Sequence, residues 1–451
     1  MSTQQLGKSE DQLQELSLAL DQGISSPVKR MLNSLPAADT AHLIESSPPK
    51  VRGLLWQLLE KEQEAEVLQE LSDDVRQYFL DQMNAAEVAE ITTGFDPDDL
   101  ADLLQQLPDA ITQQVLSSMD AQDRARVEHI LSYPEDTAGG LMNTDTITIR
   151  PSNTLDVVLR YLRRHDELPA MTDSLLVVNR QDAFIGVLPI NKLLTTNPSI
   201  TVREVMNTDI EPINAMTPAS QVAQLFERQD LVSAPVIDDG GKLLGRITID
   251  DVVDVIREEA DHSLMSMAGL EDDEDTFAPA MKTAKRRAVW LGINLITAFV
   301  ASAFIGMFQE TIDKVVALAV LMPIVASMGG IAGSQTLTLV IRAMALGQIG
   351  KSNTFWLLNR ECIVGLVNGL IWALVVSGVA YVWFDDGIIS TVIAAAMIIN
   401  LVVAVISGAA LPIILKTLKI DPALAGSVIL TTVTDVVGYI SFLGLATLFL
   451  T

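Results

Sequence analysis

Hydrophobic positions divide the chain into three regions with different periods. In the first 135 residues they recur at spacings of three and four, as in the run from Leu54 to Leu59, which predicts a superhelical stack of short amphipathic helices. From about Ala138, short β-branched or leucine-rich runs alternate with helical segments, which predicts small α/β units. From about Ala288 nearly every position is apolar, which is typical of membrane helices.

An internal repeat lies in the α/β region. The tetrapeptide MNTD occurs at Met142 to Asp145 and again at Met206 to Asp209. Each copy is followed by the predicted order strand, helix, strand, strand, helix, so two copies indicate a paired module. The layout resembles a tandem pair of CBS domains, which are small α/β units that dock on each other. That resemblance implies binding of adenosine nucleotides or ions.

The second copy carries the strand-to-helix signature of CBS domains in the segment from Gly245 to Asp251. The resemblance implies that Thr248 and Asp251 can face the ribose of a nucleotide such as ATP. In the first copy Pro189 and Lys192 occupy the corresponding places. The second copy is therefore the candidate nucleotide site.

The apolar region contains five stretches of about 20 residues or more, each long enough to span the hydrocarbon core of a bilayer. We predict spans at 288–308, 315–341, 357–384, 388–415 and 424–450, with outer turns at 309–313 and 385–387. Basic residues cluster on the opposite side: Lys282, Lys285, Arg286, Arg287, Arg342, Lys351, Arg360, Lys416 and Lys419. The positive-inside rule therefore places the N-terminus in the cytoplasm and the C-terminus outside. The first residues show no signal peptide, in agreement with that orientation.

Acidic residues dominate the part of the chain before the first span. Of 57 acidic and 30 basic residues, only seven acids and six bases follow Arg287, so nearly all of the net charge of −27 lies before the spans. This excess argues against a nucleic-acid partner and favours cations as ligands, although a solvated, self-repelling surface explains most individual acids. The single Cys362 allows no disulfide framework. Because no zinc-protease or phosphate-loop motif is present, we expect no enzyme.

Asp435 lies deep in the final apolar stretch. A charge at the bilayer centre costs about 2.5 to 3.5 kcal/mol, so an acid there is by default a functional-site hypothesis. The structural alternative is a buried hydrogen bond to Thr431, one turn earlier, or to a neighbouring helix. Because five spans with one deep acid would line only a thin pore, we favour a two-fold dimer with two Asp435 carboxylates across its axis. Magnesium suits such a site because it usually keeps several waters when it binds.

Further motifs extend the resemblance over essentially the whole chain. They are the segment from Tyr133 to Met142, Met322 to Val325 followed by Gly329 to Gln335, and Asp421 to Leu424 leading to Asp435 to Gly438. Together with the order of the regions, these motifs resemble the MgtE-type magnesium transporter and channel family.

The resemblance implies a multidomain membrane protein. Its parts are an all-α N-terminal superhelical domain at 1–137, α/β CBS domains at 138–200 and 201–257, a connecting helix with an acidic linker at 258–285, and a five-helix transmembrane domain at 286–451. It also implies a homodimer in the lipid bilayer of the cell inner membrane, whose pore is lined by Asp435 and carries Mg²⁺.

The resemblance further implies a sensor for cytoplasmic Mg²⁺, in which regulatory ions bridge the N-terminal domain, the CBS pair and the connecting helix and hold the pore shut. The matching acids are Asp98, Asp102, Asp230, Asp251, Asp254 and Glu259. Spacing independently supports two pairs among them, Asp98 with Asp102 and Asp251 with Asp254. Residues three or four apart on a helix share a face and can share a hydrated cation.

The sequence departs from the family pattern at several positions. Ile331 stands where many members have a pore asparagine, and Ser427 where a second pore amide is common. Acids are replaced at His262, Ser263, Pro218 and Ser220. Two alternatives remain open: a broader transporter of divalent cations such as cobalt, nickel or manganese, and a membrane-anchored nucleotide sensor that moves no ion.

Overall fold

The computed structural model describes residues 25–450 except 94, 96, 166–167, 271–273 and 351. Part of the acidic linker predicted within 258–285, and Lys351, one of the basic residues used to orient the spans, lie outside the described residues. Contacts within the chain separate two units. The first comprises residues 1–260 with 273–279, and the second comprises residues 261–272 with 280–451.

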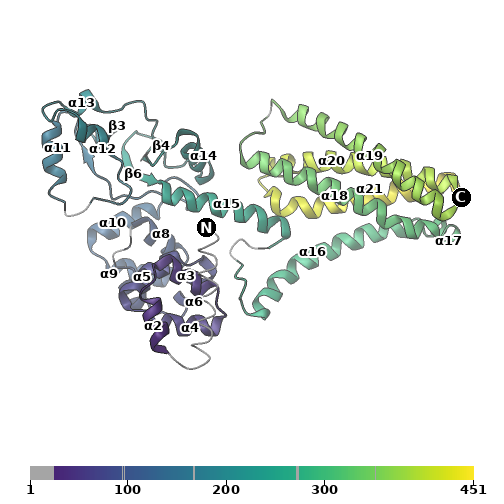
Figure 1. Ribbon diagram of the computed structural model, residues 1–451, viewed down its shortest axis with the longest axis horizontal. Helices are drawn as coiled ribbons and strands as arrows, with labels where there is room; N and C mark the ends of the chain where they lie inside the picture. The colour runs from purple at the N-terminus through teal and green to yellow at the C-terminus, as the bar shows by residue number, and fades with distance from the viewer. Residues whose placement is uncertain are drawn as a thin grey trace. The chain divides into compact units, whose positions relative to one another are not determined.

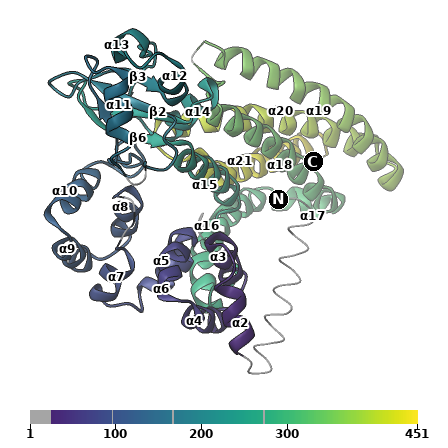
Figure 2. The ribbon, with the colours of Figure 1, turned by 60° about the vertical axis from the view of Figure 1, so that its left-hand side comes forward.

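The first unit begins with short helices (Figure 1). They are α2 (Ser25–Leu32), α3 (Ala37–Glu45), α4 (Pro49–Leu58), α5 (Lys61–Glu70), α6 (Asp73–Leu80), α7 (Ala85–Ile91), α8 (Pro97–Gln105), α9 (Asp109–Ser118) and α10 (Ala121–Ile130). Isolated helices of this length are only marginally stable in water, so packing must hold them. Alternate helices pack on each other, as α3 does on α5 and α5 on α7, and Figure 2 shows the resulting arc. The predicted superhelical domain is confirmed.

Arg52 of α4 is buried although it is charged, with 2% of its side chain exposed. Its guanidinium binds the carboxylate of Asp275 through two hydrogen bonds of 2.5 and 2.8 Å, and it also donates to two main-chain oxygens at the end of α3. Burial by itself would raise the pKa of Asp275. The hydrogen bonds and the charge of Arg52 lower it by more than burial raises it, so the pKa lies below its usual value. This ion pair fastens the segment 274–279 to the N-terminal helices.

The two CBS repeats have the predicted order of elements. The first comprises β1 (Thr148–Ile149), α11 (Leu155–Leu162), β2 (Ser174–Val178), β3 (Phe184–Pro189) and α12 (Ile190–Thr195). After α13 (Val202–Val205), the second comprises β4 (Ile213–Asn214), α14 (Ala219–Gln229), β5 (Ser233–Ile237), β6 (Leu243–Thr248) and α15 (Ile249–Ala268). In each sheet the first strand is parallel to the second, and the second is antiparallel to the third.

The repeated MNTD segments pair crosswise between the two copies. Asn143 exchanges main-chain hydrogen bonds of 2.8 and 2.9 Å with Arg246 of β6, and Asn207 does the same with Val187 of β3 at 2.7 and 2.9 Å. At Gly245 the two segments approach so closely that a Cβ atom on Gly245 would lie 2.6 Å from the main-chain oxygen of Asn143. The repeat therefore marks the segment by which each copy pairs with the last strand of the other.

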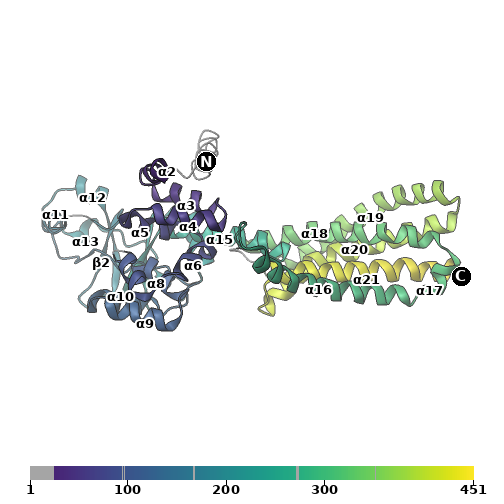
Figure 3. The ribbon, with the colours of Figure 1, turned by 90° about the horizontal axis from the view of Figure 1, so that it is seen from below.

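The second unit contains the apolar helices. They are α16 (Ala280–Gly306), the short α17 (Gln309–Lys314), α18 (Ala317–Ala345), α19 (Thr354–Phe384), α20 (Gly387–Thr417) and α21 (Pro422–Leu450). Among the described residues, α16, α18, α19, α20 and α21 are long and apolar enough to cross a membrane, which confirms the predicted five-helix domain. Figure 3 shows α18, α20 and α21 running alongside one another, and α20 packs against both of the others.

The helix of the first predicted span begins at Ala280, eight residues before that span, so it also contains the basic residues from Lys282 to Arg287. One detail of the prediction is wrong. The outer turn expected at 309–313 is instead the helix α17. Glu310 in its first turn and Lys314 in its last turn complement the helix dipole, which favours a helix over a turn.

We expect Arg52→Ala to lower the free energy of unfolding by about 3 to 5 kcal/mol, because it leaves the partly buried carboxylate of Asp275 without its cation. Chemical unfolding of the full-length protein in detergent measures this loss. The control is Lys61→Ala, which removes an exposed pair with Glu90 and should cause no measurable change. Equal stability of Arg52→Ala and the wild type would contradict the fastening role of the pair.

Candidate functional site

Asp435 lies on α21, where its side chain is partly buried. Thr431, one turn earlier, donates its hydroxyl to the main-chain oxygen of Ser427 at 2.9 Å, and Thr434 donates to the main-chain oxygen of Thr431 at 3.0 Å. Within the described residues Asp435 accepts no hydrogen bond. The hydrogen bond from Thr431 that would have given Asp435 a structural role is therefore not formed in the described part of the chain.

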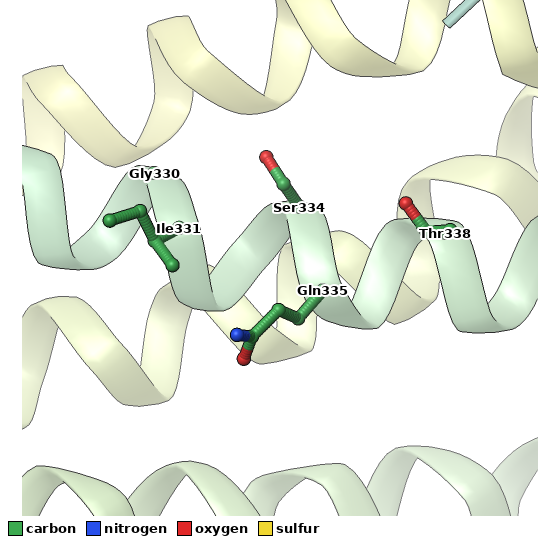
Figure 4. A pocket seen from close by; sticks show the side chains of 5 residues that line it. All are labelled: Gly330, Ile331, Ser334, Gln335 and Thr338. Atoms are coloured by element: carbon green, nitrogen blue, oxygen red, sulfur yellow. The ribbon is translucent and has the colours of Figure 1, made fainter. Parts of the chain in front are cut away.

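An open pocket of about 580 Å³ lies along α18. It is lined by Gly330, Ile331, Ser334, Gln335 and Thr338. Figure 4 shows Ser334 and Thr338 pointing to one side of the helix and Ile331 and Gln335 to the other. Ser334, Gln335 and Thr338 are exposed in the single chain. Because polar groups are unfavourable against lipid, this face of a membrane helix needs water or a polar partner.

α18 and α21 are direct neighbours. A Cβ atom at Gly333 of α18 would lie 3.0 Å from Leu430 of α21, and one at Gly426 of α21 would lie 3.1 Å from Leu337 of α18. The polar face of α18 and the carboxylate of Asp435 are therefore carried by two helices that touch without an intervening element.

A second acid is buried among the membrane helices, near the start of α19. Glu361 of α19 is only 3% exposed. It accepts hydrogen bonds from Thr336 of α18 at 3.2 Å and from the neighbouring Arg360 at 2.7 Å. Unlike Asp435, this carboxylate is neutralised by a cation of its own chain. Its place in the sequence gave no sign of the contact with Thr336, which depends on helix packing.

The end of α15, from residue 261 onward, belongs to the same unit as the membrane helices. Met267 accepts a hydrogen bond from Thr338 of the pocket, with 3.7 Å between oxygen and sulfur. His262 lies 3.3 Å from the carboxylate of Asp421, at the start of α21. The connecting helix therefore contacts both helices that carry the candidate ion path.

In the first unit, Asp102 of α8 lies among other acids. Burial, and after it the negative charges of Glu135 and Asp99, raise the pKa of Asp102 to about 7, with a smaller effect from Glu258 of α15. Burial also raises the pKa of Asp251 to about 6, and Asp99 contributes there too. The beginnings of α8 and α15 thus lie within electrostatic reach of each other. Asp99 lies on the same helix as Asp102, three residues earlier, whereas the sequence did not predict that Glu135 and Glu258 approach Asp102 from other segments.

The remaining predicted sensor acids are more dispersed. Asp98 is 7% exposed, whereas Asp230, Asp254 and Glu259 are exposed. In the part of the chain that the structure describes, no three His, Cys, Asp or Glu side chains are grouped so that they could hold a metal ion. The sensor assignment of these residues stays a prediction.

Thr248 and Asp251 lie together at the junction of β6 and α15. The main-chain N–H and the hydroxyl of Thr248 donate to Oδ2 of Asp251 at 3.2 and 2.9 Å. These bonds close the strand-to-helix turn and bring together the two side chains predicted to face a ribose. They also satisfy a free N–H near the helix start, which is sufficient as a structural role.

Known families match the chain region by region. Residues 322–445 match the MgtE family, described as a divalent cation transporter, residues 35–136 match the MgtE intracellular N domain, and residues 138–196 and 202–258 match the CBS domain. The chain is 30% identical over 440 residues to the magnesium transporter MgtE of Thermus thermophilus, an alignment that covers 96% of this chain and 98% of that protein. The chain belongs to the MgtE family.

Other MgtE proteins are similarly close. The magnesium transporter MgtE of Bacillus subtilis is 29% identical over 422 residues, which cover 94% of each chain. A solved structure, the cytosolic domain of the Mg²⁺ channel MgtE in complex with ATP, is 32% identical, has a TM-score of 0.49 and covers 54% of this chain and 99% of its own. Family membership and the apolar helices make this chain a multi-pass membrane protein.

The raised pKa of Asp102 makes the stability of this MgtE-family chain depend on pH. The pKa of about 7 in the folded state lies above the ordinary value of 3.8, so the folded state binds this proton more tightly. The corresponding stability is fully present below pH 3.8 and is lost as the pH rises through 7. We therefore expect Asp102→Asn to raise the melting temperature by several degrees at pH 8 without divalent cations, and by less at pH 5.

Thermal unfolding of the full-length protein in detergent checks this expectation. Glu128→Gln is the control, because it neutralises an exposed acid on α10. An equal effect of Asp102→Asn at both pH values would contradict the assignment of the pH dependence to Asp102.

Proposed function

We propose that the chain is a homodimeric, magnesium-selective channel of the inner membrane whose pore is gated by cytoplasmic Mg²⁺. The observation that carries this proposal is Asp435, a partly buried carboxylate on a membrane helix that accepts no hydrogen bond within the described residues. A charge at such depth is costly, and the chain itself does not offset the cost, whereas a passing cation would. Support comes from two relatives over nearly the whole chain that are magnesium transporters.

The chemistry of Mg²⁺ suits the groups present. The ion loses its waters reluctantly and is usually held by one or two carboxylates together with water. Asp435 supplies charge, and Ser334 and Gln335 on the neighbouring α18 supply neutral oxygens that can contact a hydrated ion. This arrangement needs no dedicated cage of protein ligands.

A second copy of the chain completes the proposed path. The pocket of α18 is open, and its polar side chains are exposed on a helix that must otherwise face lipid. A two-fold axis beside α18 and α21 would cover this face with the same face of the partner and bring two Asp435 carboxylates together. The polar surface would then enclose water rather than contact hydrocarbon.

Gating is proposed to act through α15. Its end contacts Thr338 of the pocket and Asp421 at the start of α21. The sensor acids Asp98, Asp102, Asp230, Asp251, Asp254 and Glu259 would bind regulatory Mg²⁺. The ion would stabilise the ionised carboxylates of Asp102 and Asp251, which burial and, to a smaller extent, neighbouring acids destabilise. Basic residues near the helix ends support an orientation with the N-terminus and this sensor in the cytoplasm and the C-terminus outside.

ATP is the proposed ligand of the second CBS repeat. Thr248 and Asp251 lie within hydrogen-bond distance of each other at the turn where the ribose would bind. Because Asp251 belongs to both proposed sites, nucleotide binding and Mg²⁺ sensing would affect each other.

A broader divalent cation transporter is the second candidate. Ile331 is 54% exposed and lines the α18 pocket with an apolar side chain, so one oxygen that could contact the hydrated ion is missing. Softer ions such as cobalt or nickel would then be excluded less strictly. The third reading, a membrane-anchored nucleotide sensor, gives Asp435 no role.

We expect wild-type protein in liposomes to carry Mg²⁺ down an inward gradient, and Asp435→Ala and Asp435→Asn to lower the flux to that of protein-free liposomes. Fluorescent dyes inside the liposomes measure Mg²⁺, Co²⁺ and Ni²⁺ in parallel. Asp313→Ala, which removes an exposed acid on α17, is the matched control and should keep the flux. Failure of the wild type to move any divalent ion at low internal Mg²⁺ would leave the nucleotide sensor as the function.

The gate is expected to close at higher Mg²⁺ than a more acidic sensor would need, because Ser220 and Ser263 stand at places where acids are common in the family. In single-channel recordings, a Ser220→Asp and Ser263→Glu double variant should close at lower Mg²⁺ than the wild type, and Asp102→Asn at higher Mg²⁺. Identical closing concentrations for all three proteins would exclude these residues from the sensor.

A further inference from the structure

Asn400 of α20 is completely buried in the membrane bundle, and the proposed function does not use it. Its Nδ2 donates to the main-chain oxygen of Val325 on α18 at 2.8 Å. Its Oδ1 is buried as well and has no hydrogen-bond partner within the described residues. An unpaired buried amide oxygen is unfavourable, so an apolar residue of similar size would make the bundle more stable.

The amide of Asn400 lies in a slot between two glycines. A Cβ atom at Gly329 of α18 would lie 2.2 Å from Nδ2, and a Cβ atom at Gly438 of α21 would lie 2.9 Å from the same atom. Any larger residue at either glycine would displace the amide. One side chain of α20 therefore contacts α18 and α21 at the same point.

Both glycines are close in sequence to the proposed ion path. Gly329 directly precedes Gly330 and Ile331 of the pocket, and Gly438 follows Asp435 by three residues, less than one turn of α21. Because a helix turn moves as a rigid piece, a shift of either glycine against Asn400 would shift its neighbour on the path.

The hydrogen bond to Val325 lies close to a proline that interrupts the main-chain hydrogen bonds of α18. Pro323 lies inside α18 and has no N–H, so the helix lacks one main-chain hydrogen bond there. Val325 follows two residues later and accepts the bond from Asn400. The amide thus supports α18 close to the interruption and just before its polar face begins.

We propose that Asn400 is a positioning residue for cation passage: its amide sets the register of α18 against α21 and thereby the separation of the polar face of α18 from Asp435. The proposal rests on the function proposed above. It explains why a half-satisfied amide is present where leucine would pack with better stability.

The test compares Asn400→Leu with the wild type as full-length protein in liposomes. We expect the melting temperature to stay equal or rise, because the unpaired oxygen is gone. The Mg²⁺ flux per folded protein should fall by about tenfold, the lower end of the effect of removing a group that orients a metal ligand, and the ratio of Mg²⁺ to Co²⁺ flux should change.

Asn368→Leu is the matched control, since it makes the same change at an exposed amide of α19. It should leave flux and ion ratio unchanged. Should Asn400→Leu fail to fold, Asn400→Ser decides in the same assays, because its shorter side chain cannot reach Val325 and adds no volume to the slot. Wild-type flux and ion ratio in the folded variant would overturn the proposal.

A distance measurement separates this proposal from the proposed function. Spin labels at Leu339 of α18 and Ile440 of α21, both exposed, report the register in a Cys362→Ser background. Asn400→Leu should shift or broaden the distance distribution, and Asn368→Leu should not. A shifted distance in a protein whose wild type carries no Mg²⁺ would support the positioning role while the transport function fails. An unchanged distance would overturn the positioning role whatever the flux.

Discussion

The cost of a polar group inside an apolar helix bundle is the constraint on which the candidate site depends. For Glu361 this cost is offset, because Arg360 and Thr336 both donate hydrogen bonds to its carboxylate. For Asn400 the cost is offset only in part, because its amide nitrogen donates a hydrogen bond whereas its amide oxygen accepts none within the described residues. Asp435 accepts no hydrogen bond within the described residues. The least compensated group is the charged one, and for that reason a cation is its proposed partner.

Close helix packing makes this arrangement possible. At Gly408 of α20 a Cβ atom would lie 2.5 Å from the main-chain oxygen of Gly333 on α18, so the two backbones touch. Within lipid the hydrophobic effect does little to drive the association of helices. Small residues at such crossings let the helices approach closely, so that van der Waals packing holds them together. The same closeness places the amide of Asn400 against both neighbouring helices. The residues that pack the helices are therefore close neighbours in sequence of the residues on the proposed ion path.

In the first unit, burial and repulsion between acids make ionised carboxylates unfavourable. Burial and neighbouring carboxylates raise the pKa of Asp102 and Asp251, so the ionised form of each is destabilised in the fold. A divalent cation near these groups would relieve that destabilisation, which gives the proposed sensor a physical basis. The Arg52–Asp275 pair differs, because there a partly buried acid is neutralised by a buried cation of the same chain.

Much of this protein follows from sequence alone, because local periods determine local structure. The three-and-four spacing predicts the short helices, the repeated tetrapeptide predicts the paired CBS units, and the apolar runs predict the membrane helices. The depth of Asp435 follows from its place in the last run. Only the tertiary structure shows that Glu135 and Glu258 lie close enough to Asp102 to raise its pKa. These contacts depend on distances between distant segments, which side-chain packing determines and sequence spacing does not.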